Sequence, residues 1–171
     1  MQPAGLTITV NTTGDADALD PNAGCDVDAG TPGDQCTLRA AIQRANAVAG
    51  EDSIEFAIPS DQPNCDAVTG KCTIKLTKAL PDLSTDIVID GPGAGKLTVQ
   101  RDTGGDYGIF KVTTSGEVTV AHLRIERGNF VNGVGGAIFK FGTANLNVIG
   151  VFFPVTLPSL EALSAPNSPA P

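Results

Sequence analysis

Short runs of alternating apolar and polar residues recur along most of the chain. In "GLTITV" (5–10), Leu6, Ile8 and Val10 alternate with threonines, which is the period of a half-buried β-strand. Further short β-branched runs, most of them closed by Gly, Asp or Asn, predict strands at 53–58, 72–76, 86–91, 96–100, 108–112, 117–128, 135–141 and 145–153. The pattern therefore predicts a protein built mainly from short strands.

One stretch, "DQCTLRAAIQRANA" (34–47), has the period of a helix instead. Its apolar residues fall at i, i+3, i+4 and i+7, which is one narrow helical face: Leu38, Ala41, Ile42 and Ala45. Thr37 can serve as the N-cap, and we expect Arg39 and Gln43 to face water. The strand runs contain no second helical stretch of this strength, which argues against a βαβ sheet and leaves a sandwich or a coil of strands.

Three apolar runs also repeat at a coarse period. "IVIDGPG", "VTVAHLRIERG" and "LNVIGVFF" begin at Ile87, Val118 and Leu146, which are 31 and 28 residues apart. Repeat periods of about 20 to 50 residues are typical of solenoids. If the runs stack as parallel coils, like residues should align in interior rows, and these rows should contain Ile87, Ile89, Val118, Val120 and Ile138.

The helical stretch and the segments that follow it resemble a known family. "CTLRAAIQRAN", followed by "IEFAI", "TIKL", "LPDLSTDIVIDGPG" and "GGAI", is similar to the N-terminal region of secreted bacterial right-handed parallel β-helix proteins. These pectin-lyase-like repeat proteins carry a Cys-Ser/Thr-Leu-Arg-Glu-Ala-Ile motif, in which Ala40 of this chain replaces the Glu. The resemblance implies an all-β fold, a right-handed parallel β-helix (solenoid) of a few coils with an N-terminal capping α-helix. A surface helix on a β-sandwich is the alternative.

The length and composition suit one domain with a core, since 41% of the 171 residues are hydrophobic. The expected organisation has four parts: an N-terminal strand with an acidic disulfide loop (1–36), the capping helix (37–49), the parallel β-helix coils (50–153) and a Pro-rich C-terminal tail (154–171).

The four cysteines form two close pairs in sequence, each enclosing loop-type residues. We predict disulfides Cys25–Cys36 and Cys65–Cys72, which belong to oxidising compartments; four reduced thiols in a cytosolic protein are the alternative. A secreted or cell-surface location follows from the disulfides, with the signal peptide absent from this chain because "MQPA" is neither basic nor apolar. No apolar run approaches the roughly 20 residues that span a bilayer.

The net charge of −8 is concentrated near the N-terminus, where residues 1–36 hold six Asp and no Lys or Arg. This sign argues against nucleic acid as a partner. No cofactor is expected from the sequence, with one exception: the loop offers hard oxygen ligands at short spacing, so it is a candidate calcium site, with a solvated acidic turn as the alternative. The candidate calcium ligands are Asp15, Asp17, Asp20 and Asp26.

The densest polar stretch within a predicted strand is "AHLRIERGNF" (121–130). His122, Arg124 and Glu126 stand at period two and should share one outward face. The family resemblance makes them candidate catalytic residues, because pectin-lyase-like enzymes place catalytic groups on outer strand faces. The Gly-His-Gly and paired-Asp motifs of galacturonan hydrolases are missing, so ordinary solvent-facing residues are the alternative. Carbohydrate binding has little aromatic support, since the chain has no Trp and one Tyr.

"LNVIGVFF" places apolar groups on both strand faces near the C-terminal end of the predicted coils. Such a run invites another chain, so we predict self-association, most simply as a two-fold homodimer. The residues expected in this interface are Val148, Ile149, Val151, Phe152 and Phe153. In the competing interpretation, residues 154–163 fold back as a cap and keep the chain monomeric.

Two classes of function remain. The first is a non-catalytic exported domain, the N-terminal part of a cell-surface or adhesin-like protein that associates with itself. The alternative is a polysaccharide-active enzyme, either a pectin-lyase-like lyase or a glycoside hydrolase, supported by fold analogy alone.

Overall fold

The computed structural model describes residues 4–129 and 136–154, and in this part of the chain it contains one helix and ten strands. The helix is α1 (Leu38–Ala47). The strands are β1 (Thr7–Val10), β2 (Glu51–Phe56), β3 (Cys72–Leu76), β4 (Asp86–Asp90), β5 (Leu97–Arg101), β6 (Phe110–Val112), β7 (Glu117–Ala121), β8 (Arg124–Glu126), β9 (Ile138–Lys140) and β10 (Asn145–Ile149). The predicted tail (154–171) lies outside the described residues except for Pro154.

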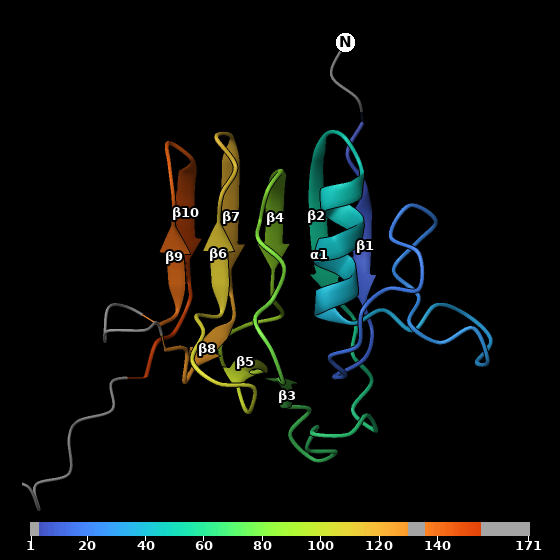
Figure 1. Cartoon of the computed structure of the whole chain (residues 1–171). Helices are drawn as coiled ribbons and strands as arrows, with labels where there is room; N and C mark the ends of the chain where they lie inside the picture. The colour runs from blue at the N-terminus through green and yellow to red at the C-terminus, as the bar shows by residue number, and fades with distance from the viewer. Residues whose placement is uncertain (1–3, 130–135, 155–171) are drawn as a thin grey trace, which may run out of the picture.

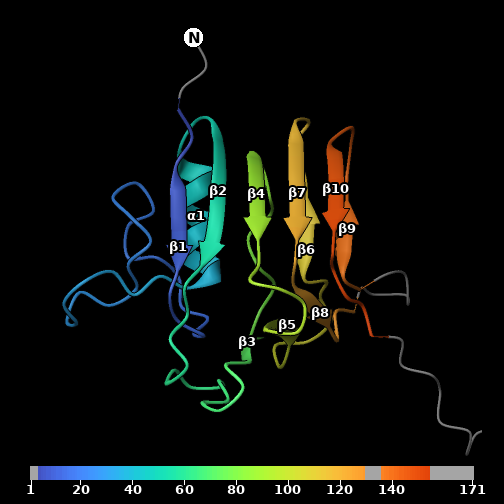
Figure 2. The ribbon, with the colours of Figure 1, turned by 180° about the vertical axis from the view of Figure 1, so that it is seen from behind.

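The named strands all pair in parallel and are divided among three sheets. The largest has the order β1-β2-β4-β7-β10, the second has the order β3-β5-β8, and β6 pairs with β9. Figure 2 shows the five strands of the largest sheet side by side and pointing the same way. In Figure 1, α1 lies in front of β1 and β2, while β6 and β9 lie in front of the other end of this sheet.

The prediction of an all-β right-handed parallel β-helix is wrong. The strands form three small sheets without a closed solenoid, and the helix is part of the core, so the fold is a mixed, α/β-like arrangement of parallel strands. The argument against a βαβ unit also fails, because β1 and β2 are parallel neighbours with α1 between them in the chain. A parallel pair needs one long crossover, and a single helix supplies it.

The helix begins where the sequence predicts. The Thr37 side chain accepts a hydrogen bond of 3.0 Å from the backbone amide of Ala40, which confirms the N-cap. The apolar face packs over β1 and β2, and its four predicted members are fully buried: Leu38, Ala41, Ile42 and Ala45. Both predicted disulfides are present; Cys25–Cys36 ties the acidic loop to the residue before the N-cap, and Cys65–Cys72 closes the loop that leads into β3.

The expectation that Arg39 faces water is wrong. The side chains of Arg39 and Asp15 are 2% and 6% exposed and lie 2.9 Å apart. The Arg39 guanidinium also donates to the backbone carbonyls of Lys78 and Ala79, at 2.9 and 2.6 Å. A buried charge is tolerated when a counter-charge and several acceptors replace water, and these partners come from segments far apart in the sequence.

The parallel register stacks apolar residues into interior rows. The predicted pairs Ile87–Val118 and Ile89–Val120 are confirmed and fully buried. Ile138 is not in these rows, because it belongs to β9 and pairs with Phe110 of β6 in the two-stranded sheet. The sequence period alone assigned Ile138 to the wrong row, because the chain turns before β9 and places this residue in a different sheet.

We predict that the buried ion pair of Arg39 is needed for stability. Arg39→Met leaves the Asp15 carboxylate buried without its counter-charge and should lower the free energy of unfolding by about 3 to 5 kcal/mol. Arg44→Met is the matched control on the same helix, because Arg44 donates only to the carbonyls of Pro21 and Asn22 and should cost about 1 kcal/mol. Urea unfolding of both variants measures the difference; equal losses would contradict the prediction.

Candidate functional site

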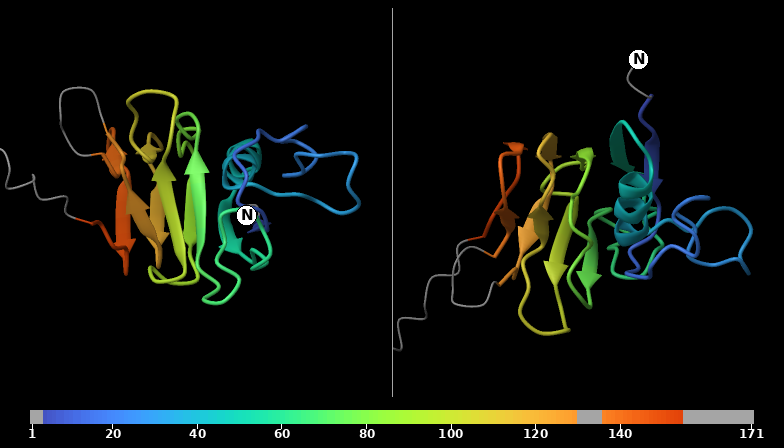
Figure 3. Two further views of the ribbon diagram at one scale, coloured as in Figure 1. Left: turned by 90° about the horizontal axis from the view of Figure 1, so that it is seen from below. Right: turned by 45° about the horizontal axis from the view of Figure 1, so that its top comes forward.

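The last strands of the three sheets lie together at one end of the molecule, which we call the open end. It consists of β9, β10 and Phe152, whose backbone bridges to Arg124 as a further parallel partner of the second sheet. In Figure 3, β9 and β10 stand together at the end of the row of strands, away from α1. All three sheets therefore end at the same surface.

Most large hydrophobic side chains that are exposed in the described residues belong to the open end or directly follow its segments, as Phe141 follows β9 and Phe153 follows Phe152: Phe141, Val148, Ile149, Phe152 and Phe153. Val148 ends an interior row whose exposure is 6% at Ile8, 0% at Ile54, Ile89 and Val120, and 44% at Val148. Four of the five residues predicted for self-association are exposed, and Val151 is half-buried. These side chains are exposed because β10 is the last strand of the largest sheet, so no further strand in the described residues covers them.

The edge of β10 that faces away from β7 has no strand partner among the described residues. The amide of Asn145 donates to the carbonyl of Gly116, and the carbonyl of Ile149 accepts from the amide of His122, both at 2.8 Å. Alternate residues of a parallel strand direct both backbone groups to the same neighbour, so Leu146 and Val148 direct theirs away from β7. Within residues 4–129 and 136–154, no strand pairs with this edge. It is an accessible template for another strand.

A cavity of about 700 Å³ adjoins the open end at the level of β8, and its lining includes Arg101, Arg124, Arg127 and Phe153. The Arg124 guanidinium is bonded to Glu126 and lies 4.6 Å from the ring centroid of Phe152, within the range of a cation–π contact. Three arginines and one carboxylate, Glu126, line this cavity, so its net charge is positive although the chain as a whole is acidic. Of these arginines, the sequence had singled out Arg124 alone.

The structure separates the three candidate catalytic residues. Arg124 and Glu126 lie on β8 and bind each other, whereas His122 has φ 51° and stands at the corner between β7 and β8. The Nδ1 atom of His122 lies 2.7 Å from Oδ1 of Asp90, and both side chains are about half exposed. Period-two reasoning missed this pairing because the corner interrupts the strand. Asp90, which ends β4 in register with Ala121 of β7, was not selected from the sequence.

The four candidate calcium ligands do not converge on one point. Each accepts hydrogen bonds or ion pairs from protein donors; the main ones are Arg39 for Asp15, Lys78 for Asp17, the amide of Asn22 for Asp20 and the amide of Gln35 for Asp26. No group of three or more His, Cys, Asp or Glu side chains in the described part is arranged to hold a metal ion. Asp15 and Asp17 join the acidic loop to Arg39 of the helix and to Lys78, which follows β3, whereas Asp20 and Asp26 accept from amides within the loop itself.

Comparisons with protein-family models, with curated proteins and with solved structures returned no significant match. The described residues contain no helix long and apolar enough to cross a membrane.

The Asp17–Lys78 pair should give a small acid-sensitive contribution to stability. The hydrogen bond from Lys78, 2.6 Å long, is the main cause that lowers the pKa of Asp17. Its contribution is present above the ordinary pKa of Asp and is lost as the pH falls through the lowered pKa. Because both side chains are about half exposed, Asp17→Asn should cost less than about 1 kcal/mol at neutral pH and nothing in strong acid. Urea unfolding across a pH series tests this; a difference that grows on acidification would contradict it.

Proposed function

We propose that this protein is a non-catalytic structural module of a secreted or cell-surface protein, and that it assembles with further copies of itself through the open end. The observation that carries the proposal is the contrast between the two ends of the interior row. Ile8 is covered by the α1 side of the core and is 6% exposed, whereas Val148 is 44% exposed. In the described part of the chain, the open end thus combines exposed apolar side chains with a strand edge that has no partner.

Burial of these side chains supplies a driving force. Full burial of a large apolar side chain is worth about 1.5 to 3 kcal/mol, and five such residues at the open end are 42 to 52% exposed. Association must offset the loss of translational and rotational freedom, and backbone pairing along β10 adds direction to the contact. A surface of this kind favours an ordered contact between strands.

The two disulfides support the proposed location. They indicate an oxidising environment, and secretion to the cell exterior is the proposal that follows from it. The non-catalytic part of the proposal is supported by the arrangement of the polar residues. His122 is paired with Asp90 at a half-exposed corner, and Arg124 with Glu126, so each of these side chains is already engaged by a neighbouring side chain.

We predict concentration-dependent association that depends on the open end. Sedimentation velocity and light scattering across a dilution series should show masses above the monomer at micromolar and higher concentrations. Val148→Lys places a charge on the exposed row and should weaken association at least about tenfold. Val68→Lys is the matched control, since Val68 is 95% exposed in the loop between β2 and β3 and should not change association. A strictly monomeric mass for the unmodified protein at all concentrations would overturn the proposal.

A further inference from the structure

We infer that the open end of one copy binds a groove along β1 of the next copy, so that copies associate head to tail. This rests on the proposed self-association and names the second surface involved. The two surfaces are the two free edges of one parallel sheet, because β1 and β10 are its first and last strands.

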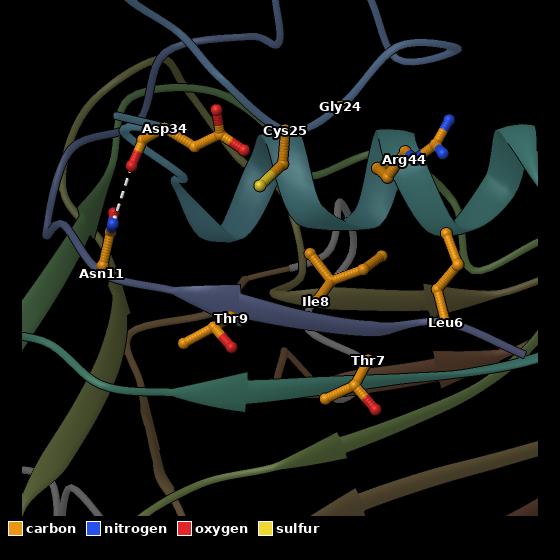
Figure 4. Close-up of a pocket in the computed structure, with 9 residues that line it drawn as sticks. All are labelled: Leu6, Thr7, Ile8, Thr9, Asn11, Gly24, Cys25, Asp34 and Arg44. Atoms are coloured by element: carbon orange, nitrogen blue, oxygen red, sulfur yellow. Dashed lines mark hydrogen bonds between the residues drawn. The ribbon is translucent and has the colours of Figure 1, made fainter. Parts of the chain in front are cut away.

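The groove lies along the free edge of β1 and has a volume of about 440 Å³. Figure 4 shows it between β1 on one side and, on the other, α1 and the loop that carries Gly24 and Cys25. Its apolar lining comes from Leu6, Ile8 and Cys25. At the end of the groove, the backbone amide of Asn11 already donates to the carbonyl of Cys36, at 3.1 Å. The part of the edge that is free to pair is therefore β1, which precedes Asn11.

The two edges are complementary in backbone hydrogen bonding. The carbonyl of Leu6 accepts from Ser53 of β2 at 2.7 Å, and that of Val10 accepts from Ala57, just after β2, at 2.9 Å. The alternate residues Thr7 and Thr9 therefore direct their backbone groups into the groove. On β10, Leu146 and Val148 direct theirs outward. With Val148 placed beside Ile8 of the next copy, the Val148 amide can donate to Thr7, and its carbonyl can accept from Thr9.

The same register also aligns the apolar side chains of the two copies. The row that runs through Ile54, Ile89 and Val120 reaches Val148 at one end and Ile8 at the other. Placing Val148 beside Ile8 of a second copy continues the row across the interface with the parallel pairing that already joins β4 to β7. The exposed Val148 side chain then enters the apolar part of the groove.

Charge favours this arrangement over a two-fold pairing of β10 with β10. The loop 11–36 follows the carboxyl end of β1 and holds six Asp and no Lys or Arg; four of the six remain after Asp15 and Asp17 pair with Arg39 and Lys78. The arginine-lined cavity at β8 lies beyond the carboxyl end of β7. In Figure 1, β8 lies below the arrowhead of β7 and part of the loop lies below that of β1, while the rest of the loop projects sideways from the β1 end of the sheet. Head-to-tail stacking brings this loop of one copy to the arginine cavity of the next, whereas a two-fold contact leaves both loops distant from the interface.

The contact is heterologous and leaves one free groove and one free open end, so growth continues instead of stopping at two copies. Two variants block one surface each. Val148→Lys blocks the open end. Gly24→Trp places an indole at the lining of the groove, and its Cβ meets no close contact because it would lie 3.9 Å from the nearest atom, Asp34 Oδ2. Gly95→Trp is its matched control, since a Cβ there has no neighbour within 4 Å and Gly95 does not line the groove.

The experiment compares sedimentation velocity of each variant alone and of their equimolar mixture. We expect Val148→Lys and Gly24→Trp each to be monomeric, their mixture to form a dimer with one copy of each, and Gly95→Trp to associate as the unmodified protein does. The 1:1 dimer also shows that both variants are folded. If Gly24→Trp alone still associates, or if the mixture gives no mixed dimer, the head-to-tail inference fails while self-association stands. If the unmodified protein stays monomeric, both proposals fail.

Discussion

The parallel register of the largest sheet is the constraint on which the rest of this structure depends. In-register parallel pairing places Ile54, Ile89 and Val120 in one fully buried row, so each strand covers the side chains of the one before it. Without further cover, the same pairing would leave an unsatisfied backbone edge and an exposed apolar row at each end of the sheet. Adding a strand to the sheet only shifts the unpaired edge and the exposed row to the new strand. Each end of the sheet therefore needs its own cover.

At the β1 end, the chain covers the row with α1, and the position of that helix depends on contacts with other segments. Thr37 caps it, Cys36 ties it to the acidic loop, and Arg39 joins it to Asp15 and to the carbonyls before β4. At the β10 end the described residues provide no equivalent cover. This difference in covering, more than any single polar group, is the basis of the proposed assembly.

The sequence predicted local features well where one short segment decides them. The helical face of α1, its N-cap and the two short-range disulfides depend on residues close together in the chain, and all were confirmed. It failed where distant segments meet. Arg39 was assigned to solvent because its helical position lies off the apolar stripe, and only the approach of Asp15 and residues 78–79 makes its burial possible. The pairing of His122 with Asp90 was missed for the same reason.

What the sequence by itself determined is which segments become strands or helix, since alternation, β-branched residues and the i, i+3, i+4 spacing act within a few residues. The distribution of these strands among three sheets was decided only in the tertiary structure. Corners such as the one at His122, with φ 51°, redirect the chain from the largest sheet to the second, and Ile138 pairs with Phe110 instead of joining the Ile87 row. Hydrophobic period and strand propensity depend on residues close together in the chain. The sheet that a strand joins depends instead on which distant strand has a free edge with which it can pair.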